Sequence, residues 1–73
     1  MYQYNTGERI SRMKIYTYRI VKENPITGEQ AKRCRMVDTA APLKIGGLYM
    51  HLKGAGHSGA WRILELMKIE EVE

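Results

Sequence analysis

A proline–glycine turn between two alternating runs of residues constrains this chain more than any other feature. Residues 13–23 are rich in β-branched and aromatic side chains, and residues 29–39 continue in a similar pattern. Between them stands Asn24-Pro25-Ile26-Thr27-Gly28. Proline presets the backbone of a turn, and glycine adopts the left-handed conformation that closes one. The sequence therefore predicts a β-hairpin.

The length of the turn predicts a register and two faces. If Asn24 faces Glu29, the pairs that follow are Val21 with Lys32, Arg19 with Cys34, and Tyr18 with Arg35. One face then carries Ile15, Thr17, Arg19, Val21, Cys34 and Met36. The other carries Lys14, Tyr16, Tyr18, Ile20, Arg33, Arg35 and Val37. The first face is more apolar, apart from Arg19, so we expect it to face the core and Cys34 to be a small core residue.

The rest of the chain predicts further short strands. Residues 40–47 form a connector, and residues 48–53 alternate as a half-buried strand. On that strand the expected inner side carries Leu48, Met50 and Leu52, and these are expected to pack around Trp61 and Ile63. Residues 60–66 are expected to form a strand, with the tail as a short strand or turn, although good helix formers in residues 64–73 leave a helix open. The fold class predicted is mostly β, a small antiparallel SH3-like barrel or curled sheet of four to five strands.

The length of 73 residues allows one domain at most. Regular alternation begins at Met13, so residues 1–12 are expected to be an N-terminal extension or short edge hairpin, and residues 13–73 the single β domain. Cys34 stands alone, which excludes an internal disulfide. No apolar run is long enough for a membrane span, and no signal peptide is expected. A cytoplasmic protein with a free thiol fits these features.

The positive charge is concentrated in the first part of the chain. The net charge is +4, and residues 1–38 account for all of it. The last residues are acidic, with Glu70, Glu71 and Glu73. Such a distribution favours a polyanionic or acidic partner on one side of the molecule.

A glycine-rich segment follows the strand expected at residues 48–53. Gly54, Gly56 and Gly59 spell G-x-G-x-x-G, but too few residues follow for a dinucleotide-binding unit. We therefore interpret the segment as a mobile hairpin loop, and as a secondary contact loop formed by Gly54, Gly56, His57 and Gly59. Cys34, His51 and His57 do not have the spacing of a metal site, and no cofactor is expected. A chain this short leaves little room for an enclosed pocket, so we expect no enzyme activity.

Bases and aromatic residues interleave on the predicted hairpin. The candidate binding residues are Lys14, Tyr16, Tyr18, Lys22, Lys32, Arg33 and Arg35. Aromatic rings can stack on bases while lysine and arginine hold phosphates. The same pattern also occurs as cross-strand packing on a solvated face. The sequence thus favours a small non-enzymatic module that binds nucleic acid or a nucleic-acid-containing complex.

A resemblance adds context to this interpretation. It rests on residues 16–21, Asn24-Pro25 with Thr27-Gly28-Glu29, Pro42-Leu43, Gly47-Leu48-Tyr49 and residues 61–64. On these residues the chain resembles small proteins of phages and mobile elements from gut Gram-positive bacteria. The resemblance implies a protein that acts by binding host machinery, and anti-CRISPR proteins are one such class. A pI near 9.4 argues against an acidic mimic of DNA, so an inhibitor of this kind would bind guide RNA or an acidic protein surface.

Two functions therefore stand as hypotheses. One is the nucleic-acid-binding module, and the other is an inhibitor of a host nuclease that acts through protein–protein binding. No membrane partner is expected. The chain is also expected to form a homo-oligomer, with the acidic tail of one copy against the basic hairpin of another.

Overall fold

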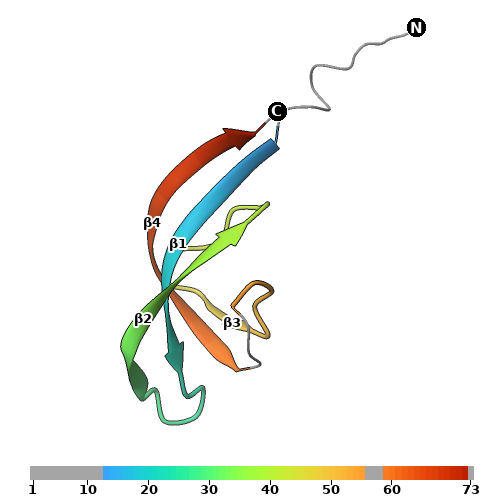
Figure 1. Cartoon of the computed structure of the whole chain (residues 1–73). Coiled ribbons are helices and arrows are strands. Elements are labelled where there is room, and N and C mark those ends of the chain that lie inside the picture. Colours follow the sequence, from blue (N-terminus) through green and yellow to red (C-terminus); the bar gives the residue numbers. More distant parts are fainter. Residues whose placement is uncertain (1–12, 56–58, 73) are drawn as a thin grey trace, which may run out of the picture.

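Four antiparallel strands form one curled sheet in this computed structural model, which describes residues 13–55 and 59–72. The strands are β1 (Met13–Glu23), β2 (Gln30–Thr39), β3 (Leu48–Met50) and β4 (Ala60–Val72). Their order in the sheet is β2-β1-β4-β3, so the long central strands β1 and β4 come from opposite ends of the sequence (Figure 1). The mostly β fold with a curled sheet is confirmed. The part of the chain that the structure describes contains no helix.

The hairpin turn between β1 and β2 is confirmed in atomic detail. The side-chain oxygen of Asn24 accepts hydrogen bonds from the backbone N–H groups of Ile26, at 2.8 Å, and Thr27, at 3.1 Å. Gly28 donates its N–H to the Asn24 carbonyl at 2.8 Å and has a φ of 81°. A side chain other than glycine would be strained at that φ, so Asn24 and Gly28 together fix the turn.

The register of the hairpin differs from the prediction. Glu23 pairs with Gln30 beside the turn, as expected from the loop length, but an irregularity follows and Val21 then pairs with Cys34 rather than Lys32. Arg19 accordingly faces Met36, and Tyr18 faces Val37. The extra residues in β2 form a bulge. Because the shift is two residues, each side chain of β2 stays on the face predicted for it.

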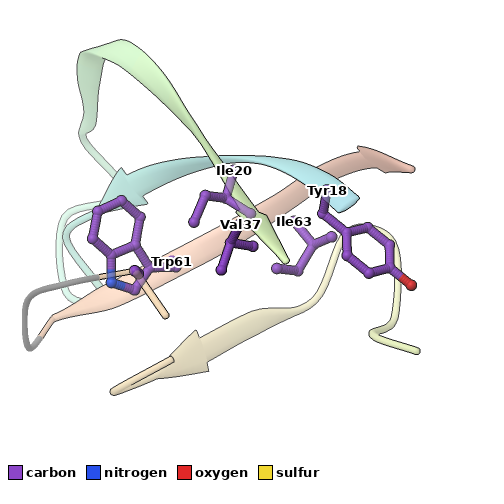
Figure 2. Packing of buried hydrophobic residues seen from close by; sticks show 6 residues of the cluster. Tyr18, Ile20, Val37, Trp61 and Ile63 are labelled. Atoms are coloured by element: carbon purple, nitrogen blue, oxygen red, sulfur yellow. The ribbon is translucent and has the colours of Figure 1, made fainter. Parts of the chain in front are cut away.

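The prediction of which face carries the core cluster is wrong, although Thr17 and Val21 of the predicted face are buried. The core consists of Tyr18, Ile20, Val37, Ala55, Trp61 and Ile63, which come together on the inner side of the curled sheet (Figure 2). The opposite face of β1 carries hydrogen bonds and ion pairs between strands, from Thr17 to Asp38 and from Arg19 to Glu65. Cys34 and Met36 on that face are exposed rather than buried in the core. Tyrosine and isoleucine on alternate residues outweigh the smaller apolar side chains of the other face when the sheet selects its inner side.

Strand β3 is shorter than predicted, and Leu48 and Met50 do not form its inner side, although Leu52 after the strand packs against the core as predicted. It ends at Met50 because His51 has a φ of 56°, which is outside the β region. Tyr49 and Leu52 pack against the core, whereas Met50 is exposed and Leu48 is not part of the core cluster. The central place of Trp61 beside Ile63 is confirmed.

Strand β4 extends beyond its predicted end. It pairs with β1 from the pair of Lys22 with Trp61 to the pair of Met13 with Val72, so the tail is a strand. The helix left open for residues 64–73 is therefore wrong for residues 64–72. Pairing with a neighbouring strand has overridden the helix propensity of this segment. β2 reaches only to the pair of Tyr16 with Thr39, and beyond it β1 and β4 continue as a two-stranded arm. We call Met13–Thr17 with Lys68–Val72 the β1–β4 arm, in which β2 still pairs with Tyr16 and Thr17. The arm occupies one end of the elongated molecule (Figure 1), whose extents are 54 × 20 × 19 Å.

Candidate functional site

The structure separates the predicted binding residues into buried and exposed groups. Tyr18 is 2% exposed and belongs to the core. Its hydroxyl accepts a hydrogen bond from the Leu43 N–H at 2.9 Å and donates one to the Leu43 carbonyl at 3.3 Å. Tyr16 is half-buried and packs against the same core. The aromatic part of the predicted face therefore stabilises the fold, and the Tyr18 ring is not open to a stacked base.

Arg35, another of the predicted binding residues, makes contacts within the protein. Its guanidinium carbon lies 5.9 Å from the centroid of the Trp61 ring, and its Nη1 donates a hydrogen bond to the Ala55 carbonyl. Ala55 belongs to the segment after β3 and is itself buried. Arg35 thus connects β2 to that segment across the inner side of the sheet, where an arginine favours an aromatic face and a carbonyl oxygen.

The hairpin end of the sheet carries three bases, Lys22, Lys32 and Arg33. All three are exposed. Glu23 pairs with Gln30 and Val21 pairs with Cys34, so Lys22 of β1 lies opposite the bulged segment 31–33 of β2. The three bases therefore lie at the same end of the sheet, on either side of the bulge. Lys14 does not join them, because it lies in the β1–β4 arm opposite Glu71.

A hollow of about 430 Å³ lies beside this cluster. It is lined by Lys22, Glu23, Asn24, Pro25, Glu29, Gln30, Ala31, Gly59 and Ala60. Gly59 has a φ of 137°, and a Cβ added there would lie 3.0 Å from the Cε atom of Lys22. Glycine at this position therefore lets the Lys22 side chain lie directly against the backbone that precedes β4.

The predicted contact loop contributes only in part to this hollow. Gly59 lines it, but Gly54 lies against Val37 on another side of the molecule, where it lines a second hollow of about 520 Å³ with Leu43 and Leu52. Gly56 and His57, also predicted for the contact loop, lie outside the described residues. The structure thus brings one residue of the predicted contact loop to the basic cluster.

Two acids line the hollow, Glu23 and Glu29, and the charge of Glu23 is already paired. Arg62 donates from Nε and Nη2 to the two carboxylate oxygens of Glu23, the first at 2.9 Å, and the Gln30 amide donates to one of them at 2.9 Å. These hydrogen bonds, first those from Arg62, lower the pKa of Glu23 from 4.5 to about 2. A carboxylate held in this way stabilises the base of the hairpin and leaves little negative charge to attract Lys22.

Within the described ranges three bases of the sheet form ion pairs, whereas the exposed bases of the hairpin, like Lys14 and Arg35, form none. Arg19 is paired with Glu65, Arg62 with Glu23, and Lys68 with Glu70 at 3.9 Å. Within residues 13–55 and 59–72, no ion pair involves Lys22, Lys32 or Arg33. Lys44 and Lys53 are exposed and also lack an ion pair within these ranges, but neither lines the hollow of the hairpin. Lys22 lines it, and Lys32 and Arg33 directly follow Ala31, which also lines it. Among the described residues, the hairpin end therefore carries three unpaired bases and one unpaired acid, Glu29, next to a concave surface.

Two features are absent from residues 13–55 and 59–72. Among those residues, no group of three or more histidine, cysteine, aspartate or glutamate side chains is placed to hold a metal ion. The described segments also contain no helix of sufficient length and apolarity to cross a membrane.

Comparison of the chain with protein-family models, with curated proteins and with solved structures gives no match.

Sequence reasoning missed the features that make this site. The pairing of Glu23 with Arg62 joins residues far apart in sequence, and no local pattern signals it. The bulge that places Lys22 opposite Lys32 and Arg33 was missed as well, since a hairpin with a turn of this length is expected to pair without irregularity. The interleaved tyrosines were interpreted as a binding feature, although their alternation marks the inner face of the sheet.

Proposed function

We propose that the hairpin end of this sheet is a binding site for nucleic acid, with Lys22, Lys32 and Arg33 in contact with backbone phosphates. The observation that carries the proposal is the juxtaposition of these unpaired bases beside an open hollow. Phosphate contacts of this kind supply most of the affinity in binding that does not depend on sequence.

The proposed mode of binding is electrostatic rather than stacking. Tyr18 is buried, and Arg35 is engaged with Trp61 and Ala55, so neither is free for a base. The hollow is shallow and open, with Gly59 giving the backbone of one wall. We propose a binding module without catalysis or cofactor, acting in the cytoplasm, where the exposed Cys34 thiol would stay reduced.

A binding titration with matched variants tests the proposal. Fluorescence anisotropy would follow labelled single-stranded and double-stranded DNA and RNA at low salt. The variant Lys32→Ala/Arg33→Ala removes two bases of the site, and Lys44→Ala/Lys53→Ala removes the same charge elsewhere. We expect the first variant to lower the slope of log affinity against log salt by about 1.4–1.8, since each phosphate contact contributes about 0.7–0.9.

The control variant is expected to keep nearly the whole slope. If both variants weaken binding equally, the positive charge acts as a whole and the hairpin is not a site. If the wild-type chain binds none of the nucleic acids at low salt, the proposal is wrong.

A second function is favoured by apolar side chains on the same hairpin. Ile26 at the tip of the turn is 91% exposed, and Met36 of β2 is 54% exposed. Exposed apolar residues close to bases are typical of a protein interface with an acidic partner. An inhibitor of a host nuclease that binds protein is therefore the alternative. Capture of the partner from a nuclease-treated bacterial lysate that fails with Ile26→Ser, while nucleic acid is not bound, would support it.

A further inference from the structure

The outer edge of β4 lacks a neighbouring strand over most of its length in the described structure. β3 pairs only with Ala60–Arg62, and the backbones of Gly46 and Gly47 bond to Ile63. From Leu64 to Val72 no described strand pairs with this edge, as Figure 1 shows for the upper part of β4. An unpaired edge exposes a row of backbone N–H and C=O groups that can bond to another strand.

The part of this edge in the β1–β4 arm is regular. β4 has register shifts opposite Thr17/Tyr18 and Arg19/Ile20, but Lys68–Val72 pairs with Met13–Thr17 without interruption. Bulges are one of the devices that protect a strand edge from another chain, and this segment has none. Beyond the pair of Tyr16 with Thr39 the arm is also only two strands wide, and a two-stranded ribbon is marginally stable in water.

The side chains of the edge are apolar and exposed. Ile69 is 52% exposed, and Leu66, Met67 and Val72 are exposed as well. On the inner face of the arm Ile69 stands opposite Tyr16, whereas Lys68 and Glu70 share the outer face. The edge from Leu64 to Val72 thus combines apolar side chains with one base, Lys68, and three acids, Glu65, Glu70 and Glu71. Lys68 and Glu70 form an exposed ion pair at 3.9 Å within the chain.

We propose that a second copy of this chain pairs with this edge, as antiparallel β4 against β4, in the register that places Ile69 opposite Ile69. This register opposes Lys68 of each copy to Glu70 of the other, so two charge pairs form across the two-fold axis. A register centred on Lys68 opposes two lysines, and one centred on Glu70 opposes two glutamates. Both alternatives are disfavoured by like charges directly opposite each other.

The dimer joins two sheets into one. The strand order becomes β2-β1-β4 followed by β4-β1-β2 of the second copy, and each arm is then supported on both sides. The basic hairpins lie away from this contact, so the inference does not depend on the function proposed for them. The sequence predicted a homo-oligomer in which the acidic tail of one copy contacts the basic hairpin of another. In the dimer proposed here, the β1–β4 arms of the two copies contact each other instead.

Charge reversal tests the register. We expect sedimentation equilibrium of the full chain to show a concentration-dependent dimer. Lys68→Glu opposes glutamate to glutamate across the axis, Glu70→Lys opposes lysine to lysine, and each variant alone is expected to be monomeric. An equimolar mixture of the two restores both charge pairs and is expected to form a heterodimer. Lys53→Glu and Glu29→Lys make the same charge changes away from the edge and should dimerise as the wild type does.

Four results would overturn the inference. The first is a wild-type chain that stays monomeric at millimolar concentration. The second is a dimer that both reversal variants retain, which would place the contact elsewhere. The third is a mixture that remains monomeric although each variant is folded by circular dichroism. Loss of the dimer in Lys32→Ala/Arg33→Ala would instead support the contact of tail with hairpin and would also contradict this register.

Discussion

Arg33 and Arg35 are two residues apart on β2, and the structure predicts opposite consequences for their replacement by alanine. Arg35 lies over Trp61 at 5.9 Å and donates a hydrogen bond to the buried Ala55. Arg33 is exposed and makes no ion pair or side-chain hydrogen bond within the described residues. Arg35 is exposed as well, as predicted for its face, so the two residues differ in their contacts and not in their exposure.

The expected magnitude follows from the contacts that each variant loses. A cation over an aromatic ring at a partly exposed site contributes about 0.5–1 kcal/mol. A hydrogen bond from a charged donor contributes about 1.5–3 kcal/mol. Arg35→Ala should therefore lower the free energy of unfolding by about 2–4 kcal/mol, whereas an exposed residue such as Arg33 changes it by at most about 0.5 kcal/mol. For a domain of this size, the low end of 2 kcal/mol corresponds to a fall in Tm of about 8–16 °C.

Urea unfolding followed by the fluorescence of Trp61, the one tryptophan, measures both variants. We expect Arg35→Ala to unfold at a clearly lower urea concentration with an unchanged slope, and Arg33→Ala to coincide with the wild type. Equal midpoints for the two variants would refute the position of Arg35 against Trp61. A large loss for Arg33→Ala would mean that the bulged segment is held by contacts different from those described.

Three further variants or conditions test the packing and the ion pairs. Trp61→Ala should cost about 3–5 kcal/mol, which is most of the roughly 4–11 kcal/mol expected for 73 residues, and circular dichroism should show a largely unfolded chain; retention of the wild-type Tm would place the ring at the surface. Tyr18→Phe should lower stability by about 1 kcal/mol because Leu43 loses its bonds to the hydroxyl; an unchanged Tm would contradict that contact. Because the pKa of Glu23 is lowered in the folded state, its stabilisation is present above pH 4.5 and is lost as the pH falls towards 2. Urea midpoints across this range should fall less for Glu23→Gln than for the wild type, and parallel profiles would count against the pairing with Arg62.

The sequence was sufficient for the elements formed by local signals. Asn24 and Gly28 define the turn through their own backbone preferences, and β1 begins at Met13 and ends at Glu23 as its alternation predicts. The burial of Trp61 could also be predicted, because no other side chain of that size is present.

The inner face of the sheet could not be chosen correctly from the sequence. Both faces of β1 carry apolar side chains, and the choice depends on which of them Trp61 and Ile63 meet from β4, at the other end of the chain. The bulge beside Lys22 and the pairing of Glu23 with Arg62 likewise arise from tertiary contacts. The sequence placed the exposed bases of the candidate site in approximately the right part of the chain. It also assigned Tyr16 and Tyr18 to the site, although Tyr18 belongs to the core and Tyr16 packs against it.

The most direct test of the proposed binding site is a nitrogen–proton correlation spectrum of the labelled chain, titrated with an oligonucleotide at low salt. We expect the largest shifts at the amides of Lys22, Ala31–Arg33 and Gly59, and small shifts at Lys44 and Lys53. The shifts should reverse when salt is added, since phosphate contacts weaken steeply with salt concentration. Shifts centred on the β1–β4 arm or on residues 40–54, or a spectrum unchanged by saturating oligonucleotide, would contradict the assignment of the hairpin end as the site that binds nucleic acid.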